Sequence, residues 1–133
     1  MFTKIRAVHV AVNNVEEAVK DYERAFGLKV SRIEPQPHNG VKIAVLPIGD
    51  AVIELIEPLN PEEGPVARSL KNRGEGIYMI ALEVDGLDAA LKSLQAKGVR
   101  LISDDAESRA KGVQPFIHPK STHGVLVELV EKA

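Results

Sequence analysis

The chain has 133 residues, of which 44% are hydrophobic and 27% charged, the balance of a single globular domain with its own core. A formal net charge of −2, without any stripe rich in lysine and arginine, argues against nucleic acid as a partner. The absence of cysteine excludes disulfides, thiol nucleophiles and sulfur-ligated zinc. No apolar run reaches membrane-spanning length and the N-terminus lacks a signal-peptide core, so we expect a soluble, cytoplasmic protein.

The first part of the chain has the pattern of a strand followed by a helix. An apolar, β-branched run at residues 5–12 predicts the strand. Asn14 is a candidate N-cap, apolar residues then recur at helical spacing up to Phe26, and Gly27 is a stop signal, which predicts a helix over residues 15–26. The remaining elements expected here are an extended segment at residues 27–30, a loop at 35–40, and strands at 41–47 and 51–57.

The same order of elements recurs from residue 77. Residues 77–84 predict a strand, Asp85 is a candidate N-cap, and an apolar stripe runs from Leu87 to Leu94 before Gly98 ends the helix. The elements expected after it are an extended segment at residues 98–101, a loop at 104–112, and strands at 113–119 and 125–131. Residues 58–76 join the two parts, with a short helix expected at 65–73.

The matching ends of the two parts favour an internal duplication. VIELIE begins at residue 52 and LVELVE at residue 126, 74 residues later. We therefore predict a single α+β domain made of two βαβββ halves, about residues 1–58 and 76–133, whose curved sheets enclose a shared cleft. A ferredoxin-like or other α+β domain with a chance likeness between halves remains the alternative. A doubly wound nucleotide-binding fold is disfavoured because neither strand–helix turn is rich in glycine.

Three polar residues interrupt strands that are otherwise apolar: His9, Glu54 and Glu128. Both faces of these strands are apolar, so the carboxylates should point into a cavity, where an unpaired charge is heavily penalised. Two carboxylates that converge with an imidazole would make a divalent-cation site. Taken singly, each has a plainer interpretation, because a lone strand glutamate is usually solvated and a lone strand histidine is usually a hydrogen-bonded core residue.

The opening HVAV and the stretches IELIEPL, RGEGI and HPKS-x-x-GVLVEL resemble the methylmalonyl-CoA epimerases of the vicinal oxygen chelate superfamily, which has a glyoxalase-like fold. The resemblance covers essentially the whole chain. It implies epimerisation of methylmalonyl-CoA by a metal-assisted 1,1-proton transfer through an enolate, with an acyl-CoA as substrate and a homodimer as assembly. It also implies that His9, Glu54 and Glu128 bind a divalent metal (Co, Mn, Ni, Mg or Zn) and that Glu128 carries a proton in catalysis.

Two positions depart from the family. The family normally reads GIHHIA where residues 76–81 read GIYMIA, so Met79 replaces a metal-binding histidine, and we expect it to line the substrate site. A thioether is a poor ligand for Co²⁺, Mn²⁺ or Mg²⁺, so the site either binds its metal weakly or has lost it. Some epimerases have a glutamate where this chain has Ile43, which leaves the second proton carrier unassigned.

The loop HPKST resembles the part of the family that lies near the substrate's acyl and carboxylate end. The resemblance implies that His118, Lys120 and Ser121 contact substrate, although Lys120 is equally well explained as a solvated turn lysine. Two further functions stay open. One is a lyase or isomerase of the same superfamily, like glyoxalase I, that acts on another acid or thiol adduct. The other is a non-catalytic binding protein of the bleomycin-resistance type, which would need no metal.

Overall fold

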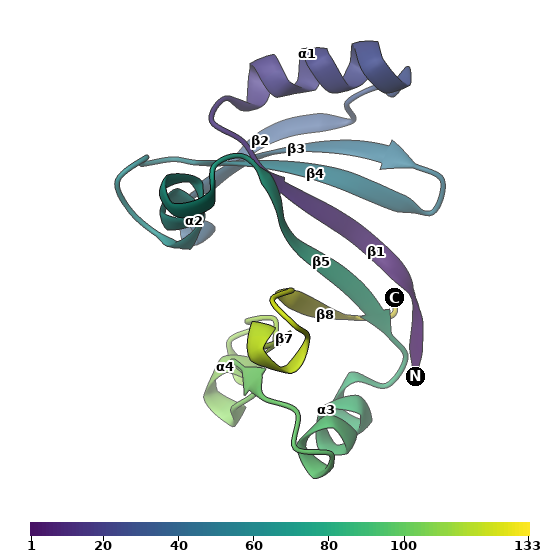
Figure 1. The fold of residues 1–133 in the computed structure, drawn as a ribbon. Helices are drawn as coiled ribbons and strands as arrows, with labels where there is room; N and C mark the ends of the chain where they lie inside the picture. The colour runs from purple at the N-terminus through teal and green to yellow at the C-terminus, as the bar shows by residue number, and fades with distance from the viewer. The chain divides into compact units, whose positions relative to one another are not determined.

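The structure is a computed structural model that describes residues 1–133 and divides into two compact units, drawn in Figure 1. The central unit comprises residues 7–78, and the terminal unit comprises residues 1–6 and 79–133. Strands β1 (Phe2–Ala11) and β5 (Gly76–Val84) each contribute residues to both units.

The central unit is a four-stranded sheet with a helix on each face. Its strands lie in the order β2-β3-β4-β1, with β1 parallel to β4 and the other neighbours antiparallel. Figure 1 shows α1 on one side of these strands and α2 on the other. The remaining elements of the unit are α1 (Val15–Phe26), β2 (Arg32–Gln36), a 3₁₀ turn η1 (Pro37–Asn39), β3 (Val41–Ile48), β4 (Ala51–Pro58) and α2 (Pro65–Arg73).

Helix α1 begins and ends where the sequence predicts. The Asn14 side chain accepts a 2.9 Å hydrogen bond from the Glu17 N–H, which satisfies a backbone donor at the helix start. Gly27 adopts a left-handed φ of 69° and its N–H donates to the Glu23 carbonyl, closing the last turn. Even α1, at 12 residues, is too short to span a bilayer, and no helix is both long and apolar enough to do so.

Each face of the central sheet carries its own apolar cluster. Because neighbouring strand residues alternate between faces, Val10 faces α1 whereas Ala11 faces α2. The buried residues of the α1 cluster are Val10, Val12, Val15, Val19, Ala44, Leu46 and Leu55. The buried residues of the other cluster are Ala11, Val41, Ile43, Val45, Ile56 and Val66, with Val52, Leu70 and Tyr78 packed against them. We call the side of the sheet that carries this second cluster the α2 face.

The terminal unit has the same strand order with α3 in place of α1. Its strands lie in the order β5-β8-β7-β6, with β5 parallel to β8 and the other neighbours antiparallel. Val84, Val127 and Leu129 pack with the apolar stripe of α3 to form its core. The remaining elements are α3 (Leu87–Ala96), β6 (Leu101–Ile102), α4 (Ala106–Ala110), β7 (Phe116–Ile117), a 3₁₀ turn η2 (Pro119–Ser121) and β8 (Val127–Glu131).

The prediction that Asp85 caps α3 is wrong. The N-cap residue is Gly86, which has no side chain to accept a hydrogen bond. The backbone N–H groups of Gly86 and Leu87 at the start of the helix instead donate to the Glu131 carboxylate at 3.1 Å. The central unit uses the same device, because the Glu57 carboxylate accepts from the Val15 N–H at 2.8 Å. In both units, the last glutamate of the repeated motif therefore caps the helix that follows the first strand.

The predicted loops and strands are corrected in three places. Residues 104–112 contain the short helix α4, which begins because Asp105 accepts from the Ser108 N–H at 2.9 Å. The expected loop at residues 35–40 instead holds the end of β2 and the turn η1, since prolines are tolerated on an edge strand and at the start of a turn. The strand expected at residues 113–119 is shortened to β7, Phe116–Ile117.

Candidate functional site

His9 and Glu54 lie side by side on the α2 face. They are register partners on the parallel strands β1 and β4, and His9 Nδ1 lies 3.7 Å from Glu54 Oε1. Both side chains are largely buried, with 8% and 19% of their surface exposed. Two of the three polar strand residues singled out in the sequence are thus brought together.

Burial governs the charge of this pair. It lowers the pKa of His9 to about 4, so the imidazole is neutral at pH 7 and the pair is not an ion pair there. Burial also raises the pKa of Glu54, an effect that the Arg32 charge partly opposes and the Glu34 charge reinforces. A neutral imidazole beside a desolvated carboxylate is poised to gain from a bound cation, because both offer lone pairs in a site poor in water.

Arg32 belongs to the same row of side chains across the sheet. The register pairs Arg32 with Val45, Val45 with Glu54, and Glu54 with His9, so all four point to the α2 face. Two strand spacings place Arg32 about 10 Å from Glu54 along this row. Sequence reasoning missed Arg32 because this residue lies between the extended segment predicted at 27–30 and the loop predicted at 35–40. The alternation of Arg32 and Glu34 around Ile33 was the available signal.

Met79 and Glu128 share the other face of the terminal sheet, away from α3. Glu128 pairs with Ala81 on the parallel strand β5, and Met79 lies two residues before Ala81 on the same face. The intervening residues Ile80 and Leu82 pack on the α3 side. His9 stands directly opposite Glu54 in register, whereas Met79 is offset by two residues from Glu128. The two halves therefore differ in the placement of these pairs.

Phe116 is a neighbour of Glu128 that the sequence did not single out. It is the register partner of Glu128 on the antiparallel strand β7, so its ring lies on the same face, with Ala81 on the opposite flank of Glu128. The phenyl group and the alanine methyl therefore flank Glu128 on the two neighbouring strands. The convergence of Glu128 with His9 and Glu54 stays a prediction.

The segment HPKST forms the tight turn η2. Of its three residues predicted to contact substrate, His118 and Ser121 accept hydrogen bonds from backbone N–H groups of the chain. The His118 side chain accepts a 3.0 Å hydrogen bond at Nδ1 from the Lys120 N–H, which caps the turn. The Ser121 hydroxyl accepts one at 2.9 Å from the Arg100 N–H. Lys120 is exposed and its ammonium group makes no ion pair. Their contact with substrate stays a prediction.

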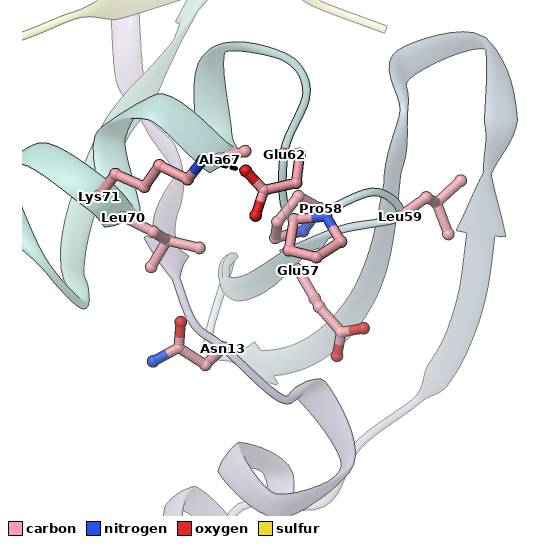
Figure 2. A pocket seen from close by; sticks show the side chains of 9 residues that line it. Asn13, Glu57, Pro58, Leu59, Glu62, Ala67, Leu70 and Lys71 are labelled. Atoms are coloured by element: carbon pink, nitrogen blue, oxygen red, sulfur yellow. Dashed lines mark hydrogen bonds and ion pairs between the residues drawn. The ribbon is translucent and has the colours of Figure 1, made fainter.

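The central unit also holds a pocket of about 350 Å³ between the end of β4 and α2 (Figure 2). Its lining includes none of the residues predicted for the site. Lys71 and Glu62 point toward one another at its edge as an ion pair, and Glu57 is engaged by the Val15 N–H. The full lining is Asn13, Glu57, Pro58, Leu59, Pro61, Glu62, Ala67, Leu70 and Lys71. With Lys71 paired to Glu62 and Glu57 bonded to the Val15 N–H, this pocket offers no unpaired charged group for chemistry.

A divalent metal is the cofactor that the family resemblance implies. His9 and Glu54 fit it as ligands, because one is a neutral imidazole, the other a largely buried carboxylate, and they are adjacent. Within the central unit no third histidine, aspartate or glutamate completes a metal-binding group with them. The thioether of Met79 does not suit a hard or borderline ion.

Comparison with known proteins agrees with this arrangement of strands and residues. Residues 7–116 match the Glyoxalase/Bleomycin resistance protein/Dioxygenase superfamily. The mitochondrial methylmalonyl-CoA epimerase of Mus musculus is 35% identical over 127 residues, 95% of this chain and 71% of that protein.

Two solved structures are similar over nearly the whole chain. The methylmalonyl-CoA epimerase of Mycobacterium tuberculosis has a TM-score of 0.84 at 32% identity, covering 99% of this chain and 89% of that one. A variant of the Streptomyces coelicolor methylmalonyl-CoA epimerase, in complex with 2-nitronate-propionyl-CoA, has a TM-score of 0.85 at 30% identity, covering 100% and 96%.

The chain therefore belongs to the glyoxalase, bleomycin resistance protein and dioxygenase superfamily. The expected α+β class and glyoxalase-like fold are confirmed. Within that superfamily, the chain is a member of the methylmalonyl-CoA epimerase family. The domain boundaries near residues 58 and 76 stay a prediction.

Proposed function

We propose that this protein epimerises methylmalonyl-CoA by moving a proton at the carbon between the thioester and the carboxylate. The observation that carries the proposal is the buried His9–Glu54 pair, an arrangement with little value to the fold itself because both groups lose hydration there. Membership of the epimerase family supports the choice of substrate.

Glu128 is the proposed proton carrier on one face of the reacting carbon. The reaction breaks the α C–H bond, leaves the electron pair in an enolate, and forms a new C–H bond from the opposite face. In this scheme the Glu128 carboxylate takes or returns the proton on its side, with Phe116 and Ala81 as its neighbours across the sheet. The carrier on the other side remains unassigned.

The electron pair must be stabilised on the thioester oxygen. A divalent metal held by His9, Glu54 and Glu128 would supply a Lewis acid for that charge. His9 contributes by staying neutral, since its lowered pKa keeps a lone pair available throughout the neutral range. Glu54 contributes a negative charge that is poorly solvated and therefore strongly attracted to a cation.

The test is Glu128→Gln, which keeps the shape of the side chain but removes its charge and basicity. We expect turnover of methylmalonyl-CoA to fall by about 100-fold or more, the usual contribution of a positioned general base. Loss of α-proton exchange with deuterated water, followed by proton NMR, would place the defect in proton transfer. Glu107→Gln, at an exposed glutamate of α4, is the matched control. Full turnover in Glu128→Gln would remove this residue from the mechanism.

Met79 favours one second candidate, a binding protein of the bleomycin-resistance type, because it replaces a ligand position with a thioether. Such a protein would bind an acyl-CoA without exchanging its α proton. The deuterium-exchange assay on the unaltered protein separates the two functions.

We further propose a homodimer. Two apolar residues near the start of β1, within the terminal unit, are exposed: Phe2 leaves 45% of its surface exposed and Ile5 leaves 55%. Exposed apolar side chains on a strand are commonly covered by a partner. Light scattering coupled to size exclusion should give twice the chain mass of 14.4 kDa. A monomer at micromolar concentration would contradict this. The cytoplasmic location expected from the sequence stays a prediction.

A further inference from the structure

Arg32 stands at the exposed end of the row of side chains that leads to the His9–Glu54 pair. It lies on β2, the edge strand of the central sheet, and its side chain keeps 56% of its surface exposed. Val45 separates Arg32 from Glu54 in the register, so the guanidinium projects from the same face as the buried pair. The two backbones are about 10 Å apart across the row, a separation that the two side chains together can span.

Glu34, two residues along the same face of β2, orients this guanidinium. The Arg32 Nε donates to Glu34 Oε1 at 3.1 Å. Glu34 pairs in register with Ile43, a member of the apolar cluster on the α2 face, which fixes the face on which the ion pair lies. Because only Nε is engaged, the two Nη groups of Arg32 make no hydrogen bond or ion pair within the chain. Together they can bind both oxygens of a carboxylate.

The charge of Arg32 acts on the buried pair without being neutralised by it. The guanidinium opposes the increase that burial causes in the pKa of Glu54, yet it forms no ion pair with that carboxylate. Its ion pair with Glu34 is largely exposed, and such pairs contribute little to stability. By contrast, Lys42 on the neighbouring strand β3 is paired with Glu16 of α1. Arg32 is therefore the cation of this sheet that can take an anion beside the candidate site.

We propose that Arg32 binds the free carboxylate of the substrate and so holds the reacting carbon beside His9 and Glu54. The identity of that substrate rests on the proposed function. In a malonyl thioester the carboxylate and the thioester carbonyl are bonded to the same carbon, so the anion must lie close to the groups that act on that carbon. The phosphates of the nucleotide are at the far end of the pantetheine arm. A cation in the same row as the buried pair therefore matches the carboxylate.

The first experiment measures binding without turnover. Dissociation constants are determined by calorimetry for malonyl-CoA and propionyl-CoA, which differ by the free carboxylate. We expect Arg32→Gln to bind malonyl-CoA about tenfold more weakly and propionyl-CoA as before, because only malonyl-CoA loses a charged partner. Arg32→Lys keeps the charge but not the fork, so it should lose less affinity than Arg32→Gln. Arg24→Gln, at an exposed arginine of α1 paired with Asp21, is the matched control and should bind both ligands normally.

Malonyl-pantetheine, which lacks the nucleotide, separates the carboxylate from the phosphates. We expect Arg32→Gln to weaken its binding as much as that of malonyl-CoA. Weaker binding of both CoA compounds with malonyl-pantetheine unaffected would show a phosphate contact and overturn the proposal, and so would equal weakening of all three ligands. Malonyl-CoA binding that Arg32→Gln leaves intact would overturn this inference alone. If the unaltered protein binds none of the three, the proposed function fails and this inference fails with it. Unchanged melting temperatures show that each variant is folded.

Discussion

Lowering the pH from 8 to 5 should remove the part of the protein's stability that depends on a neutral, buried His9. In the unfolded chain the imidazole binds a proton near its ordinary pKa of 6.5, whereas burial lowers its pKa in the folded protein to about 4. Between these two values the unfolded state holds a proton that the folded state excludes. Protonation therefore stabilises the unfolded state, and the free energy of unfolding falls as the pH drops through this window.

The two pKa values of His9 set the size of the effect. At pH 5 the unfolded imidazole is almost fully protonated and the folded one almost fully neutral, which costs about 2 kcal/mol relative to pH 8. Below pH 4 the loss levels off at about 3 kcal/mol, the free-energy equivalent of the full pKa difference. For a domain of this size, 2 kcal/mol lowers the melting temperature by roughly 8 °C.

The assay compares urea unfolding of the unaltered protein and His9→Gln at several pH values, with a chelator present to exclude metal ions. Glutamine keeps much of the shape but does not titrate, so the difference between the two proteins isolates His9 from the carboxylates. That difference should change by about 2 kcal/mol between pH 8 and pH 5. His123→Gln, at an exposed loop histidine, is the control. A difference that stays constant across this range would show that His9 is not desolvated and would refute the reasoning.

Two further predictions concern the metal and the fold. Met79→His adds an imidazole on the face that carries Glu128, so Co²⁺ or Mn²⁺ should bind more tightly in a calorimetric titration; unchanged affinity would mean that residue 79 does not reach the metal. Glu57→Ala removes the acceptor of the Val15 N–H and should cost about 1 kcal/mol, seen as a melting temperature about 4 °C lower. Glu63→Ala, at an exposed glutamate, should leave the melting temperature unchanged, and equal melting points for both would contradict the capping role.

The helices were predictable because their signals are local. Asn14 marks the start of α1 and Gly27 its end, each through a hydrogen bond to a residue no more than four positions away. The apolar residues between them recur at the spacing of a helix. The start of α3 was mispredicted because its acceptor, Glu131, lies 44 residues away from Leu87 and only the folded sheet brings it there. Local sequence patterns carry no information about such a partner.

The candidate site divides in the same way. The polar residues His9 and Glu54 stood out because they interrupt apolar strands, but their adjacency depends on the register of β1 and β4. Phe116 could not be singled out from the sequence, because an aromatic residue in an apolar strand is ordinary. Only its register with Glu128 places it near the candidate site.

The glutamates that end β4 and β8 have a consequence for the order of folding. Each must reach the first turn of a helix across a long loop, 42 residues for Glu57 to Val15 and 44 for Glu131 to Leu87. Closing such a loop costs entropy before the hydrogen bond can form, so these contacts should be made after the sheet has assembled, on the native side of the folding barrier. Loss of either glutamate–helix hydrogen bond should therefore speed unfolding and leave the folding rate nearly unchanged. Because each unit has its own glutamate–helix hydrogen bond, each bond slows the unfolding of its own unit.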